Sequence, residues 1–164
     1  MRDIMSKIAI LTDSSCDIPQ EMAEKYNIDI MSFHILLDDV DYVERESCSN
    51  EEFYAKMRAA KGVPSTAAIT PIQFCEKYCQ YVDEGYTDVI HVPINRSGSS
   101  TYNNAVMAQG MLREERPEHH LKIHLIDSHT YSMPFGWYLC EMARKLQNLS
   151  LIHISEPTRP ISIS

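Results

Sequence analysis

Short apolar runs alternate with segments of helical periodicity along most of this chain. The runs are rich in β-branched residues and end at turn-forming residues, which is typical of buried strands. They predict strands over residues 7–12, 28–37, 87–93 and 121–126, with a short return strand over 42–44. Helices are predicted up to about residue 26, over residues 50–60, 71–84 and 101–115, and from about 134 onward. Because strands alternate with helices, we expect an α/β fold with a layered, mostly parallel sheet and helices on both faces.

Helix-capping residues stand where this pattern begins the first three helices. Asp17 is a suitable N-cap for the first helix, and Ser49 or Asn50 is suitable for the second. Thr70 precedes Pro71, which is a favoured first residue of a helix. We therefore expect these helices to begin at the capped positions.

Hydroxyl-rich segments follow three of the predicted strands. Residues 12–15 follow the first strand, residues 95–101 the third and residues 127–130 the fourth. Parallel strands place their carboxyl ends at one edge of a sheet, where ligands of such folds bind. A helix start there offers free N–H groups and positive potential. The pattern therefore predicts a binder of something small and anionic.

Each cluster also has an ordinary structural interpretation. Ser14 and its hydroxyl neighbours could bind a ligand oxygen or cap the following helix. The loop 98–101 could hold one carboxylate or monophosphate, or be a polar turn; it lacks the Gly-Lys-Ser/Thr ending of a P-loop.

The alternative function is a small hydrolase or phosphotransferase that acts on a small anionic substrate and uses Asp13, Ser14 or His129. It needs His129 within hydrogen-bond reach of Ser14, and the sequence pairs no base with a nucleophile. A pure interaction fragment is a third interpretation.

Composition narrows the class of protein. A length of 164 residues fits one domain, and the net charge of -8 argues against nucleic acid and against an anionic membrane surface. No apolar run is long enough for a membrane span, so we expect no stable membrane insertion. Five cysteines, an odd number in a chain of this size, indicate a reduced cytoplasm. Cys75 and Cys79 are assigned to core packing, and neither a metal nor a cofactor is expected.

The composition changes abruptly at Leu149. Residues 149–159 resemble the direct translation of a transposase adapter end used in sequencing libraries. A segment of this kind carries no information about the fold. We therefore expect one domain over residues 1–148 and a non-native tail over 149–164.

The same motifs resemble a known family. Residues 12–19 match its opening Thr-Asp-Ser-Ser-x-Asp-Leu/Ile-Pro, and residues 64–71 keep Thr66 and Pro71 of its second motif. Residues 98–105 keep Ser99 and Thr101 of the third motif, with Ser100 in place of a glycine, and 127–128 match an Asp-Ser after a strand. Over residues 7–147 the chain resembles the N-terminal part of the DegV family of bacterial fatty-acid-binding proteins.

The resemblance implies a two-domain protein with a long-chain fatty acid in a tunnel between the domains, of which the second is expected to be absent here. It implies that Thr66 and Ser99 hold the carboxylate, and that some members present the acid to a separate fatty acid kinase, which makes an acyl-phosphate. The fatty acid would then be a ligand, and the protein would not be an enzyme. Together with the hydroxyl clusters, this gives six candidate ligand-binding residues: Thr66, Ser99, Thr101, Ser14, Asp13 and Ser100.

Overall fold

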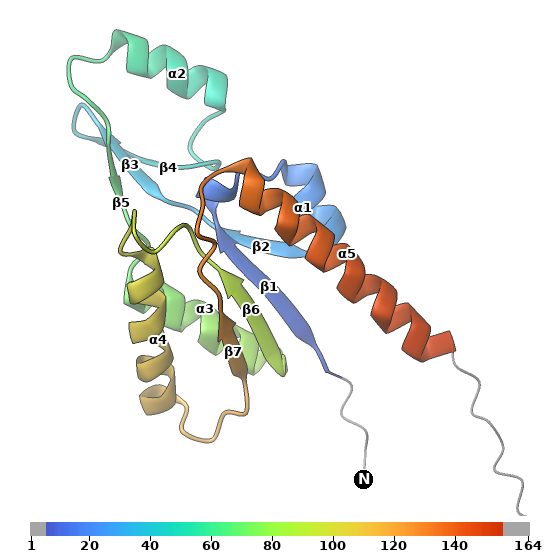
Figure 1. Cartoon of the computed structure of the whole chain (residues 1–164). Coiled ribbons are helices and arrows are strands. Elements are labelled where there is room, and N and C mark those ends of the chain that lie inside the picture. Colours follow the sequence, from blue (N-terminus) through green and yellow to red (C-terminus); the bar gives the residue numbers. More distant parts are fainter. Residues whose placement is uncertain (1–5, 156–164) are drawn as a thin grey trace, which may run out of the picture.

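A four-stranded parallel sheet forms the centre of the molecule (Figure 1). The computed structural model describes the backbone of residues 6–155 and the side chains of residues 6–148. The strands lie in the order β2-β1-β6-β7, with bounds Ile28–Met31, Ile8–Asp13, Asp88–Val92 and Lys122–Leu125. Ile10 of β1 pairs with Ile28 on one side and with Ile90 on the other. The first strand in the sequence is therefore a central strand.

Helices cover both faces of this sheet, as the sequence predicts (Figure 1). Helices α3 and α4 cover one face, α1 and α5 the other, with bounds Pro71–Asp83, Thr101–Glu115, Gln20–Tyr26 and Met133–Ser155. Successive residues of β1 point to opposite faces. Leu11 lies in the core with Phe74 of α3, whereas Ile10 lies in the core with Phe135 of α5. None of the described helices is both long and apolar enough to cross a membrane.

A second, antiparallel sheet corrects one sequence prediction. The apolar run 28–37 is two strands, because β3 (His34–Leu37) pairs with β4 (Val40–Val43) and with the unpredicted β5 (Ser65–Ala67). The break falls at Phe33, whose N–H donates to the Ser14 hydroxyl at 3.0 Å. Helix α2 (Asn50–Ala59) follows β4, and none of its residues is buried by the described part of the chain.

The predicted caps are confirmed at two helices and wrong at one. Thr70 and Ser49 each form a reciprocal capping box at the start of α3 and α2. Asp17 does not cap α1. It ends a 3-10 turn, η1 (Ser14–Cys16), in the left-handed conformation, and its carboxylate accepts a hydrogen bond from the Ser132 hydroxyl. Pro19 stands at the N-cap of α1 instead.

The predicted domain end and tail fall largely outside the described residues. The backbone of α5 stays helical to Ser155. The side chains of residues 149–155 and all of residues 156–164 lie outside the described part. The assignment of 149–164 to a non-native tail therefore stays a prediction.

Helix α5 packs closely against η1 through Gly136. A Cβ atom at this position would overlap the Cys16 carbonyl oxygen and stand only 2.9 Å from Cγ1 of Ile18. A backbone oxygen cannot move aside as a flexible side chain can. In contrast, a Cβ at Gly110 of α4 would meet nothing within 4 Å.

These two glycines predict opposite effects of the same substitution. Alanine is favoured over glycine in a helix interior by about 0.5–1 kcal/mol. We expect Gly110→Ala to raise the free energy of unfolding by about that amount, and Gly136→Ala to lower it because α5 is pushed off η1. Urea denaturation of both variants measures the difference. A Gly136→Ala variant as stable as Gly110→Ala would contradict the close packing.

His91 of β6 is a fully buried histidine. Its Nδ1 lies 2.7 Å from the Tyr78 hydroxyl oxygen, and its ring centroid lies 4.9 Å from that of Phe74. Within the described residues its Nε2 has no hydrogen-bond partner. Burial lowers the pKa of His91 to about 3, so the folded protein keeps this ring neutral.

This burial predicts a loss of stability in acid. Between the ordinary histidine pKa of about 6.5 and the folded value, the unfolded state binds a proton that folded His91 does not. The free energy of unfolding therefore falls as the pH drops through this window, by up to ~1.4 kcal/mol per pH unit. His91→Gln, which does not titrate, should show a shallower pH dependence in urea denaturation. His129→Gln is the control, because the His129 side chain is 83% exposed; equal slopes for wild type and His91→Gln would refute the assignment.

Candidate ligand-binding site at the carboxyl edge of the sheet

The three hydroxyl clusters meet at the carboxyl edge of the parallel sheet, as the topology predicts. β1 ends at Asp13 and runs into η1, and β6 ends at Val92 and leads to the loop before α4. β7 ends at Leu125, just before Asp127. The Asp127 carboxylate accepts hydrogen bonds from the N–H groups of Arg96 at 3.1 Å and His129 at 3.0 Å. The second and third clusters are therefore bonded to each other.

A cavity of about 440 Å³ opens where these loops meet the second sheet. Its lining combines hydroxyls with apolar side chains and one carboxylate, and consists of Ser15, Phe33, Ile35, Glu44, Thr66, Ala68, Ile94, Gly98, Ser99 and Ser100. Thr66, Ser99 and Ser100 of the six candidates thus line one cavity. Thr66 reaches it from β5 of the antiparallel sheet, not from the carboxyl edge of the parallel sheet.

Ser99 is held in place by Thr101. The two hydroxyl oxygens lie 2.8 Å apart, and the Thr101 N–H lies 3.3 Å from the Ser99 hydroxyl oxygen. Thr101 is fully buried as the first residue of α4 and is not part of the cavity lining. Ser100 makes no side-chain cap to the described start of α4. The positive end of this helix therefore stands beside the two serines that line the cavity.

Asp13 is engaged inside the protein. One carboxylate oxygen accepts hydrogen bonds from the N–H of Ser15 at 3.2 Å and from its hydroxyl at 2.5 Å, and the other accepts from the N–H of Ile94 at 2.7 Å. Burial, the largest effect, raises the pKa of Asp13 above its usual range. Asp13 does not line the cavity, but it positions Ser15 and Ile94, which do.

Ser14 also acts from behind the cavity wall. Its hydroxyl donates to the Glu44 carboxylate and accepts from the N–H of Phe33 at 3.0 Å. Glu44 and Phe33 both line the cavity. Sequence reasoning missed Glu44, because the hairpin that carries it gave no local sign of facing the hydroxyl clusters.

The arrangement required by the hydrolase alternative is not found among the described residues. The Ser14 hydroxyl bonds to Glu44 and Phe33, and no histidine is among its partners. Nδ1 of His129 lies 3.4 Å from the Asp127 carboxylate, and its side chain is 83% exposed. The described geometry therefore activates neither Ser14 nor His129 as a nucleophile–base pair.

Comparison with known proteins identifies the family of this chain. A family model for DegV proteins, described as uncharacterised, matches residues 7–153. A DegV domain-containing protein of Clostridium perfringens is 33% identical over 145 residues, which cover 88% of this chain and 49% of the relative. The chain thus spans about half the length of the curated relatives it matches.

Solved structures of similar proteins show the same fold. A Thermotoga maritima protein described as revealing a fatty acid binding function superposes with a TM-score of 0.75 at 28% identity, covering 87% of this chain and 50% of that one. The fatty acid kinase B3 protein of Streptococcus pneumoniae, loaded with linoleic acid, has a TM-score of 0.65 at 20% identity, covering 85% and 49%. With a family model matched over nearly the whole described chain and curated relatives above 30% identity, this chain belongs to the DegV family.

Proposed function

We propose that this chain binds a long-chain fatty acid and holds its carboxylate with Ser and Thr hydroxyls. The observation that carries the proposal is the cavity itself, because Ser15, Thr66 and Ser99 reach it from three separate segments. Apolar side chains of Phe33, Ile35 and Ala68 line the same space. A ligand with an anionic head and an apolar tail matches both parts of this lining. The fatty acid binding described for the Thermotoga maritima relative supports the same ligand class.

Hydroxyls and a helix start are sufficient for a single carboxylate. Hydrogen bonds to a charged group stabilise it by about 1.5–3 kcal/mol each. The start of α4 adds favourable positive potential beside Ser99 and Ser100. In this proposal the chain needs no cofactor and catalyses no reaction of its own.

The first test removes the two hydroxyls. We expect Thr66→Ala combined with Ser99→Ala to weaken oleate binding by at least about a hundredfold, since each of the two lost hydrogen bonds costs ~1.5 kcal/mol or more. Calorimetric titration of the purified chain with oleate measures this, and mass spectrometry of denatured extracts reports any copurified acid. Ser65→Ala is the matched control, because Ser65 lies next to Thr66 on β5 but outside the cavity lining.

A second protein distinguishes failure of the proposal from the lack of the relatives' second half. Because the relatives are about twice as long, the titration is repeated on a fusion that adds the second half of the Clostridium perfringens relative. Absence of bound acid in both proteins, or equal affinity of the double variant and the Ser65→Ala control, would overturn the proposal.

Neutralising Glu44 should strengthen oleate binding, whereas removing the hydroxyls should weaken it. Its carboxylate lines the cavity and repels an anionic head group there. Two unit charges about 4 Å apart repel by ~1 kcal/mol in water. Glu44→Gln keeps an oxygen for the Ser14 hydroxyl, so oleate binding in the same titration should tighten by a factor of about five. Weaker binding would show that Glu44 supports the ligand and does not oppose it.

We further propose that the bound acid is presented to a separate fatty acid kinase. The family resemblance implies this partner, and the Streptococcus pneumoniae protein, which shares the fold, is described as a fatty acid kinase B3 protein loaded with linoleic acid. The carboxylate would stay at the mouth of the site while the tail is covered.

A reconstituted assay tests the partner. Purified bacterial fatty acid kinase, ATP and oleate should form acyl-phosphate only when this chain or the fusion is present. The Thr66→Ala and Ser99→Ala double variant should reduce that product in step with its loss of oleate binding. A protein that binds oleate but does not support phosphorylation by any kinase tested would contradict the partner and leave the fatty acid proposal standing.

A further inference from the structure

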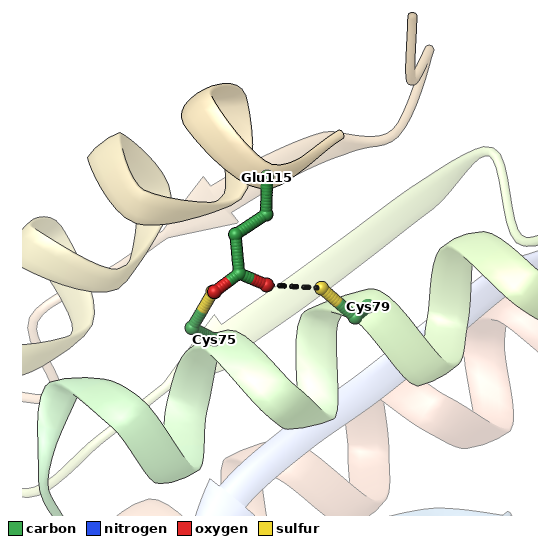
Figure 2. A group of neighbouring side chains, drawn as sticks. All are labelled: Cys75, Cys79 and Glu115. Atoms are coloured by element: carbon green, nitrogen blue, oxygen red, sulfur yellow. Dashed lines mark hydrogen bonds between the residues drawn. The ribbon is translucent and has the colours of Figure 1, made fainter. Parts of the chain in front are cut away.

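Two cysteines and a glutamate converge between α3 and α4, away from the proposed ligand site. Cys75 and Cys79 lie one turn apart on α3, and Glu115 is the last residue of α4. The sulfur and carboxylate atoms of the three residues all lie within 4.8 Å of one another. Figure 2 shows the Glu115 side chain reaching from α4 toward both sulfurs, with the Cys79 Sγ 3.6 Å from its Oε2.

This group could not be recognised from sequence spacing. Cys75 and Cys79 share one face of a helix, which by itself predicts core packing. Glu115 follows Cys79 by 36 positions and joins the pair only because α3 and α4 pack side by side. Among the described residues, this is the one group of three metal-ligating side chains at such short range.

We propose that Cys75, Cys79 and Glu115 bind a thiophilic divalent cation of the Zn²⁺ class. Zinc takes four tetrahedral ligands from thiolates, imidazoles and carboxylates at bond lengths of about 2.0–2.3 Å. In a tetrahedron those bond lengths place neighbouring ligand atoms about 3.3–3.8 Å apart. The group therefore needs only a small closing movement to hold such an ion, whereas two sulfur ligands disfavour Mg²⁺ and Ca²⁺.

The burial of the three ligands leaves a route to solvent. Cys75 is buried, Cys79 is half-buried and Glu115 is exposed. An ion entering past Glu115 can keep a water molecule as its fourth ligand. Burial, followed by the neighbouring Cys79 and Glu115, raises the pKa of Cys75 to about 11. A metal ion binds the thiolate form of a cysteine, so an ion bound at Cys75 releases a proton to the solvent.

The site would tie two helices together at the edge of the sheet opposite the cavity. α4 begins beside the cavity and ends at Glu115, where the Arg116 guanidinium also lies 3.4 Å from the Asp83 carboxylate at the end of α3. An ion bound there stabilises the folded state by an amount that grows with the logarithm of its concentration above the Kd. This inference does not depend on the proposed fatty acid ligand.

Metal titration of the full chain, free of any affinity tag and reduced with a non-thiol reductant, tests the site. After removal of metal with a chelator, we expect one Zn²⁺ to bind per chain in competition with a chromophoric chelator. Co²⁺ in place of Zn²⁺ should give the intense near-ultraviolet absorption of sulfur-to-metal charge transfer. The midpoint temperature of thermal unfolding should rise with added Zn²⁺.

Matched variants locate the ion. Cys79→Ser and Glu115→Gln should each weaken Zn²⁺ binding by at least the roughly tenfold that even an outer-shell change causes, and Cys79→Ser should also reduce the Co²⁺ charge-transfer band. Cys48→Ser and Glu114→Gln are controls outside the group and should bind as wild type. Cys75→Ser is confirmatory only if circular dichroism shows it folded. Absence of stoichiometric Zn²⁺ binding, or unchanged binding in Cys79→Ser and Glu115→Gln, would show that the three residues make only a thiol–carboxylate contact.

Discussion

The buried carboxylate of Asp13 fixes the loops on which the candidate site depends. A buried ionised group is costly unless donors replace its water, and the Ser15 backbone and hydroxyl together with the Ile94 N–H supply them. These bonds join the ends of β1 and β6, the two central strands. The positions of Ser15 and Ile94 in the cavity wall follow from this one group. An acid that looks like a ligand in the sequence is a structural support of the site.

Ser14, the next residue, holds the second sheet against the end of β1. Its hydroxyl reaches both the Phe33 N–H and the Glu44 carboxylate, and the Glu44 N–H donates to the Phe33 carbonyl at 2.9 Å. Phe33 precedes β3 and Glu44 follows β4, so both ends of the hairpin are held against the end of β1. β5, which carries Thr66, pairs with β3 and is positioned by the same bonds.

Local sequence patterns predicted the features of the fold that depend on residues close together in the chain. The alternating runs and the Ser49 and Thr70 caps fixed most strands and helices, because side-chain periodicity and capping act within a few residues. The break at Phe33 and the left-handed Asp17 depend on Ser14 and Ser132, partners far along the chain. Ser99 and Ser100, which line the cavity, could be named in advance from their hydroxyl-rich loop, and Thr66 from the family resemblance, whereas Glu44 could not. The supporting roles of Asp13, Ser14 and Thr101 likewise needed the tertiary structure.

The central place of β1 has a consequence for how the chain is made. β1 pairs on one edge with β2, which follows it closely in the chain, but its other edge pairs with β6, and Thr12 and Val92 are 80 residues apart. At synthesis rates of about 5–20 residues per second, β6 follows β1 out of the ribosome after roughly 4–16 seconds. During that interval a hydrophobic strand has one unpaired edge, which is a template for association with other nascent chains. The topology therefore leaves this edge of β1 open to wrong partners until β6 has been synthesised.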